Sequence, residues 1–148
     1  MAVSDHDKER AVDRWLEDVS AASRCWKAAK AAQESSESIV AYLEEVKSHV
    51  GVDGDLGRRM DEAIAKNREN AERLAVAAER LSELERGFYG VMEAIRPAEV
   101  AEAWRMHYVE GKTWSKCAKL LHYNRQHLNR LSRRAKAVVY DKIPRSYR

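Results

Sequence analysis

The side chains best suited to chemistry in this chain are arginines and amides that recur at helical spacing near the C-terminus. They are Arg125, Gln126, Asn129 and Arg130. Arginine donates to the two major-groove acceptors of guanine, while asparagine and glutamine match the donor and acceptor of adenine. We therefore expect these four side chains to contact base edges in the major groove of double-stranded DNA.

A second set of polar side chains is of the kind that binds phosphate. Lys116, Asn124, Arg133 and Arg134 donate hydrogen bonds or carry positive charge, and phosphate contacts position a protein on DNA without reading its sequence. His127 fits a base contact, a phosphate contact or a place on the flank of the helix, and the sequence leaves these three open.

Residues 113–135 predict the two helices that would position these side chains. Apolar residues recur at helical steps in two short runs, which His122, Tyr123 and Asn124 separate. Gly111 is suited to ending the preceding helix, and Thr113 and Asn124 are suited to capping the two that follow. The predicted buried positions are Trp114, Cys117, Ala118 and Leu121, then Leu128, Leu131, Ala135 and Val138. This pattern predicts a helix-turn-helix, although any three-helix domain has amphipathic runs with capped starts.

Charge divides the chain into two parts. Residues 1–96 hold 15 Lys and Arg against 20 Asp and Glu, a net charge of −5, and residues 97–148 hold 12 against 4, a net charge of +8; together these give the +3 of the whole chain. A basic segment is expected for contact with a phosphate backbone, whereas an acidic one would be repelled. We therefore expect a helical domain for oligomerisation or partner contact over residues 1–96 and a DNA-binding domain over residues 97–148.

The first of these domains has the pattern of a long antiparallel coiled-coil hairpin, so the expected fold class is all-α. Two stripes at steps of three and four flank a glycine-rich segment, residues 51–57, which predicts the turn. Folding about its centre would place Val40 near Asn67 and Trp15 near Met92. The stripes are Val12, Trp15, Val19, Ala22, Trp26, Ala29, Gln33, Ser36, Val40, Leu43 and Val50, then Met60, Ile64, Asn67, Ala71, Leu74, Ala78, Leu81, Phe88, Met92 and Ile95. Ile39 and Val46 widen the first stripe near its end.

Two features of the hairpin leave alternatives open. Gln33, Ser36 and Asn67 put polar groups in the middle of the seam, where they would either fix the register or accompany local fraying. Trp15 and Trp26 are large for a two-helix seam, which favours a homodimer or higher homo-oligomer unless these rings pack on the C-terminal domain.

Several function classes are disfavoured by composition. No apolar run reaches membrane-spanning length and the first residues lack a signal-peptide core, so we expect a cytoplasmic protein with no membrane partner. Cys25 and Cys117 are interpreted as reduced core residues. A metal site from Cys117, His107, His122 and His127 would lack the close paired spacing of zinc modules, and nothing else predicts a metal, a cofactor or catalytic residues.

The second helical region resembles region 4 of sigma-70-like factors. The matching residues are Tyr108 to Trp114, Cys117 and Ala118, Leu121, Asn124 and Arg125, Leu128, and Arg134 and Ala135. Within this matching stretch the residue type departs from that family at two positions: Cys117 stands where isoleucine is usual, and His122 stands where a turn glycine is usual. The resemblance is specific over about residues 95–140, and no counterpart of the promoter-melting region 2 precedes it.

The whole layout is similar to phage-encoded late transcriptional regulators of the ArpU/RinA type. The segments DLGRRMDEAIAKN and YNRQHLNRLSRRA carry this likeness. The resemblance implies a sequence-specific transcription regulator, phage- or prophage-encoded, that binds promoter-region DNA and contacts RNA polymerase. The alternative is a phage small terminase subunit that binds a packaging site, which a ring of eight or more subunits would favour. A coiled-coil scaffold with a basic tail is the third possibility.

Overall fold

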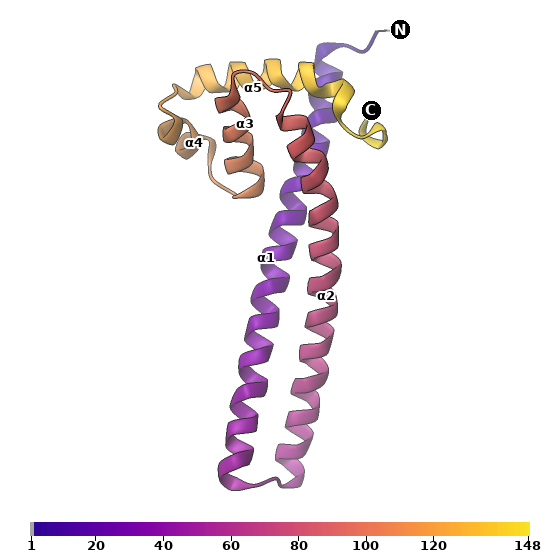
Figure 1. Cartoon of the computed structure of the whole chain (residues 1–148), viewed down its shortest axis with the longest axis vertical. Coiled ribbons are helices and arrows are strands. Elements are labelled where there is room, and N and C mark those ends of the chain that lie inside the picture. The colour runs from indigo at the N-terminus through magenta and orange to yellow at the C-terminus, as the bar shows by residue number, and fades with distance from the viewer. Residues whose placement is uncertain (1) are drawn as a thin grey trace. The chain divides into compact units, whose positions relative to one another are not determined.

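The computed structural model describes residues 2–148, which form helices and no strand. Two long helices, α1 (Asp5–Val50) and α2 (Gly54–Met92), pack together and are followed by short ones (Figure 1). These are α3 (Ala98–Trp104), η1 (Arg105–Val109), α4 (Trp114–Leu121), α5 (Arg125–Val139), η2 (Tyr140–Lys142) and η3 (Arg145–Tyr147). The expected all-α class with two long N-terminal helices is confirmed.

The chain divides into two compact units. One contains the residues up to Ser23 together with Leu81–Arg148, and the other is the hairpin segment Arg24–Arg80. The ends of α1 and α2 therefore share a unit with the C-terminal helices. This division follows packing, and it differs from the functional boundary after residue 96 that charge predicts.

The loop between α1 and α2 is shorter than the sequence predicts. It comprises residues 51–53 alone, because α2 begins at Gly54 and takes in Gly57. Asp53 caps this helix, its Oδ1 accepting from the Leu56 backbone N–H at 2.7 Å, and Gly51 takes a positive φ of 77°. A capping side chain thus lets the helix begin within the glycine-rich segment.

The shorter loop shifts the pairing of the two arms by about one helical turn. Asn67 lies beside Gln33 and Ser36, with its Oδ1 accepting from Gln33 Nε2 at 3.1 Å and from Ser36 Oγ at 2.7 Å. The predicted pairing of Asn67 with Val40 is therefore wrong. Ile64 and Ala71 are exposed, while Asn70 is buried and donates from Nδ2 to the Ala32 carbonyl at 3.2 Å. These hydrogen bonds favour the register-fixing alternative for the polar middle of the hairpin.

The unit that carries the C-terminal helices has its own apolar core. Trp15 is fully buried there, with its ring centroid 6.0 Å from that of Phe88. Its size is thus accommodated within one chain and gives no argument for a second copy. Pairing with Phe88 in place of the predicted Met92 follows from the same shift as in the hairpin. The largest fully buried side chains of this core are Trp15, Leu16, Phe88, Ile95, Trp104, Leu128 and Ile143.

The two cysteines have different surroundings. Cys117 is buried as predicted, but Cys25 is exposed, so the prediction that both are core residues is wrong for Cys25. It lies on a flank of α1 and not in the seam that faces α2. No helix formed by residues 2–148 combines the length and apolar character needed to cross a membrane.

Candidate nucleic-acid interface

Three residues define the ends of α4 and the start of α5, which a tight turn joins. Thr113 Oγ1 accepts from the Lys116 N–H at 3.2 Å, and Asn124 Oδ1 accepts from the Gln126 and His127 N–H groups at 2.9 and 3.4 Å. His122 ends α4 with φ of 60° and ψ of 35°, the left-handed conformation. Both predicted caps are confirmed, and histidine occupies the position where glycine would be free of strain.

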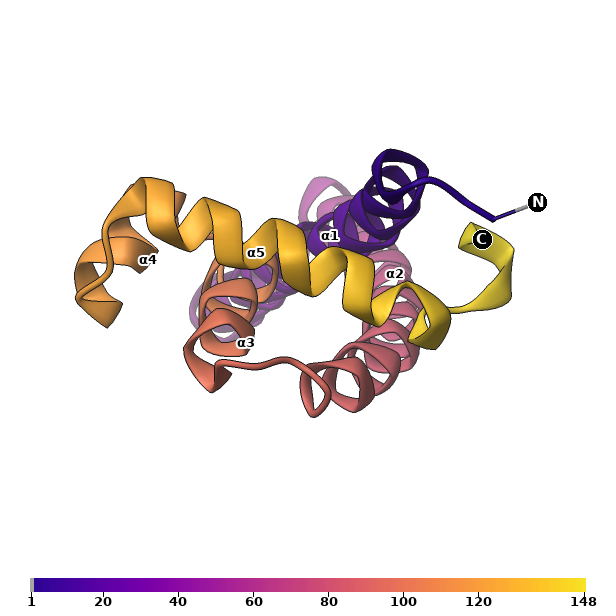
Figure 2. The same cartoon turned by 90° about the horizontal axis from the view of Figure 1, so that it is seen from above.

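A small core holds the two helices against the preceding segment. Cys117, Ala118 and Leu128 are buried together with Ala103 and Met106. Trp114, Leu121 and Tyr123 pack partly buried around them. In Figure 2 α5 lies across α3, with α4 beside its first turns. The exposed fraction of Ala118 is 3%, which fits its predicted place where two helices approach closely.

The buried face of α5 differs from the predicted one in two of its four residues. Ser132 and Val139 are buried, whereas the two residues predicted there are not: Leu131 is half-buried and Val138 is 62% exposed. The buried residues of α5 are Leu128, Ser132, Ala135 and Val139, which follow one another at steps of four, three and four. Ser132 can lie in the core because its Oγ accepts a hydrogen bond from Trp104 Nε1 at 2.9 Å. A hydroxyl with a partner of this kind can occupy a core position that sequence patterning assigns to an apolar side chain.

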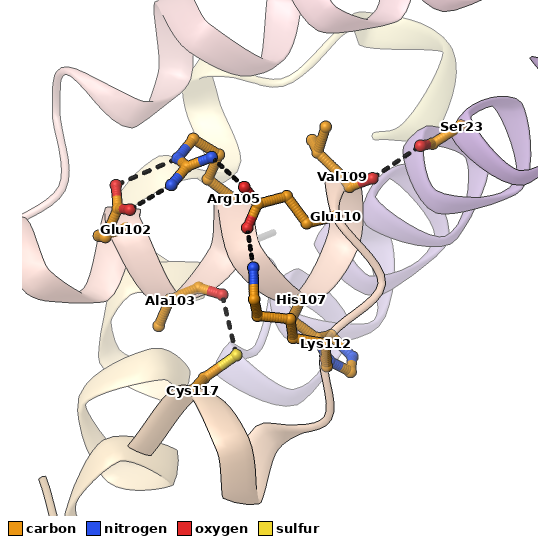
Figure 3. Close-up of polar contacts among 9 residues, drawn as sticks. All are labelled: Ser23, Glu102, Ala103, Arg105, His107, Val109, Glu110, Lys112 and Cys117. Atoms are coloured by element: carbon orange, nitrogen blue, oxygen red, sulfur yellow. Dashed lines mark hydrogen bonds and ion pairs between the residues drawn. The ribbon is translucent and has the colours of Figure 1, made fainter. Parts of the chain in front are cut away.

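Ion pairs fix the segment that leads into α4 (Figure 3). Arg105 donates to both Glu102 and Glu110, and Lys112 Nζ lies 2.5 Å from Glu110. Hydrogen bonds from Arg105 lower the pKa of the Glu102 carboxyl, and those from Lys112 and Arg105 lower the pKa of Glu110. Two of the acidic side chains of residues 97–148 are thus neutralised on this segment, before α4 begins.

Backbone contacts hold the same segment. His107 Nδ1 lies 2.7 Å from the Lys112 carbonyl oxygen, and its ring stacks on Trp114 with centroids 4.0 Å apart. Ser23 Oγ donates to the Val109 carbonyl at 2.7 Å, which ties η1 to α1 within the same unit (Figure 3).

Burial raises the pKa of the Cys117 thiol, whose Sγ lies 3.8 Å from the Ala103 carbonyl oxygen. Within residues 2–148 no three His, Cys, Asp or Glu side chains gather as a metal site would require.

All the residues predicted to contact DNA are exposed on α4, on α5 or in the turn between them. They are Lys116, Asn124, Arg125, Gln126, His127, Asn129, Arg130, Arg133 and Arg134. Three of them also have partners within the protein. Asn124 caps α5, Arg125 Nη1 donates to Ser115 Oγ at 3.1 Å, and His127 stacks on Tyr123 at 5.8 Å between centroids.

The sequence prediction omitted part of the α4 surface. Ser115, Lys116, Lys119, Leu120 and His122 line a shallow hollow on it. Lys119 follows Lys116 by three residues, so helical spacing alone would have added it to the predicted set.

The exposed faces of these helices carry charge of one sign. Between residues 111 and 140 there are eight Lys and Arg and no Asp or Glu. Lys112 pairs with Glu110, and Lys136 pairs with Asp13 at 2.7 Å. Within the described part of the chain the other six form no ion pair; they are Lys116, Lys119, Arg125, Arg130, Arg133 and Arg134. We call these six residues the basic surface.

Comparison of the chain with protein-family models, with curated proteins and with solved structures finds no match.

Proposed function

We propose that α4 and α5 bind double-stranded DNA, with α5 entering the major groove. The observation that carries this proposal is the basic surface, six exposed cations without a protein counterion on two helices that contain no acidic residue. On the same face of α5, Gln126 and Asn129 are exposed amides of the type that pairs with adenine. Cations alone would suit any polyanion, whereas cations and amides together on one helix suit a base-reading surface.

Counterion release supplies the affinity of such a surface. Each phosphate that a lysine or arginine neutralises contributes about −0.9 to the slope of log affinity against log salt. Six contacts would give a slope of about −5, so binding would weaken steeply between low and physiological salt. The charges of Glu102 and Glu110 are balanced by Arg105 and Lys112, which reduces the repulsion that these carboxylates would exert on phosphates.

Within this proposal the protein is a sequence-specific transcription regulator of phage or prophage origin that acts in the cytoplasm with RNA polymerase. The likeness of residues 95–140 to sigma region 4 and the order of hairpin and basic helices support it. We expect the regulator to work as a homo-oligomer, since two linked modules bind two DNA sites with far greater avidity than one.

Selection of bound sequences from random double-stranded DNA, using the full chain, tests the proposal. The expected result is an enriched motif that contains guanine and adenine at positions contacted by arginine and amide side chains. Salt-sensitive binding without an enriched motif would indicate a basic scaffold. Absence of binding at low salt would contradict the proposal.

A further inference from the structure

Helix α1 carries a second stripe at heptad spacing within the hairpin segment, apart from the one that faces α2. Its members follow one another at steps of three and four, and none is charged. All are exposed except Val46, which is half-buried. The stripe comprises Cys25, Ala28, Ala32, Ser35, Ile39, Tyr42 and Val46.

The opposite flank of α1 shows that a stripe without charged residues is unusual for a surface that faces solvent. Five of its seven positions over the same length are charged: Lys27, Lys30, Glu34, Glu37 and Glu44, with Ala41 and Ser48 as the others. A helix flank facing water normally carries such residues. Ile39 and Tyr42 are 52% and 64% exposed in the single chain, so large apolar groups lie on the uncharged flank without cover. The prediction that Ile39 widens the seam between the arms is therefore wrong.

The large members of the stripe border a hollow between the arms. Ile39, Tyr42 and Leu43 line it on α1, and Ala63 lines it on α2. Its far wall is formed by Arg59, Glu62 and Lys66. Along α2 this wall continues as charges that alternate in sign, namely Arg59, Glu62, Lys66, Glu69 and Arg73. If the same surface of a second chain lies against this one, charges that alternate in sign can attract as well as repel each other. Charges of a single sign could only repel.

We propose that this stripe binds the same stripe of a second copy of the chain, with the two α1 helices antiparallel. Small residues fill its first half and large residues its second half, so an antiparallel arrangement places large groups against small ones. A two-fold axis through Ser35 provides this match. It sets Ile39 opposite Ala32, Tyr42 opposite Ala28 and Val46 opposite Cys25 of the second copy, and Ser35 opposite its symmetry mate.

The size of the hairpin segment suits such a dimer. Each arm, Arg24–Val50 or Gly54–Arg80, is about 40 Å long at 1.5 Å per residue, and two helices side by side are about 20 Å across. One face therefore offers about 800 Å², which is what each partner buries in a stable protein interface. Heptad spacing on both sides allows the knobs-into-holes packing that continues this face into a four-helix bundle.

Sedimentation of the full chain measures the association directly. We expect a mass of twice the 17.0 kDa of one chain. Ile39→Glu and Tyr42→Glu should each raise the dimer dissociation constant about 30-fold or more, because each replaces a large apolar contact of the interface by a carboxylate that must lose its water. Ser38→Glu is the matched control, since it adds the same charge at an exposed position of α1 outside the stripe. Helical circular dichroism should remain unchanged in all three.

Disulfide cross-linking tests the orientation. In a Cys25→Ser background, Ser35→Cys should oxidise to a covalent dimer while Ser38→Cys should not. The native Cys25 should form no disulfide with its own mate, because the antiparallel arrangement separates the two. A Cys25–Cys25 disulfide would overturn the antiparallel arrangement, and a monomer across the concentration series would overturn the interface. Both measurements are made without DNA, so their outcome is separate from that of the proposed DNA binding.

Discussion

Arg125 and Arg130 occupy the part of α5 where a side chain would reach base edges, whereas Arg133 lies further along the helix at a position expected to meet phosphate. Arg125→Ala and Arg130→Ala should each cost about 1–3 kcal/mol on the selected DNA and relax its base preference. Arg133→Ala should weaken binding to all sequences evenly and reduce the salt slope by about one unit. Competition binding with single-base variants of the site measures both effects. A changed base preference in Arg133→Ala alone would reverse the assignment.

His122 adopts a backbone conformation that glycine takes without strain. Its φ of 60° costs a residue with a Cβ about 1 kcal/mol, and its side chain is exposed. His122→Gly should therefore stabilise the protein by about 0.5–1 kcal/mol in urea unfolding, despite the greater freedom of glycine in the unfolded chain. His122→Val is the contrasting variant and should be destabilising, because a β-branched residue tolerates positive φ poorly. Equal stability of all three proteins would contradict the left-handed turn.

Ala118 sits where α4 meets the rest of its unit. Ala118→Leu adds three carbons among Ala103, Met106, Cys117 and Leu128, and the overpacking should cost about 1–3 kcal/mol or more. Thermal unfolding should shift to lower temperature, and DNA affinity should fall with it. Leu120→Ala is the control on the same helix, since Leu120 is 51% exposed and its loss should leave the melting temperature nearly unchanged. Wild-type melting of Ala118→Leu would rule out close packing at this crossing.

The ion pairs before α4 should make stability depend on pH in a defined direction. The lowered pKa values of Glu102 and Glu110 mean that their contribution is complete above the ordinary glutamate pKa of about 4.3, and is lost as pH falls through the lowered values. A Glu102→Gln, Glu110→Gln double variant should be less stable than the wild type at pH 7 but equal to it once the wild-type carboxyls are protonated. Urea unfolding at both pH values measures this. Glu83→Gln, at an exposed site on α2, is the control and should leave the stability unchanged at both pH values.

Local signals at the ends of elements predicted the structure well. Thr113, Asn124 and Gly111 act through their own side chains or backbone, and the structure has them in the predicted roles. Pairing over longer distances was predicted less well. Three glycines in residues 51–57 indicated a loop, but the Asp53 cap allows α2 to begin at Gly54, and this moved Asn67 from Val40 to Gln33. The buried face of α5 was also misplaced at Val138. It includes Ser132, whose hydrogen-bond partner Trp104 lies 28 residues away in the sequence and could not be seen from helical spacing.

At the scale of the whole molecule, exposure of the predicted DNA-contacting side chains was accessible from sequence, because helical periodicity places the polar residues of α5 opposite Leu128 and Ala135. Lys119 was equally accessible, because it follows Lys116 by three residues on α4. The place of Trp15 was not: the sequence leaves its ring either between two chains or against the C-terminal domain, and the structure buries it beside Phe88 of its own chain. Which of several partners buries a large side chain depends on the register of the arms, and the residues of α1 alone do not specify it.

The most direct test of DNA binding by the basic surface is the affinity of the full chain and of two charge-reversed variants for one labelled DNA duplex, across a series of salt concentrations. Arg130→Glu changes the basic surface, and Arg68→Glu makes the same change in net charge at an exposed position of α2. We expect Arg130→Glu to bind at least about 10-fold more weakly with a shallower salt slope, and Arg68→Glu to bind as the wild type does. Equal affinities of both variants and the wild type, or equal losses in the two variants, would contradict a DNA-binding role for α4 and α5.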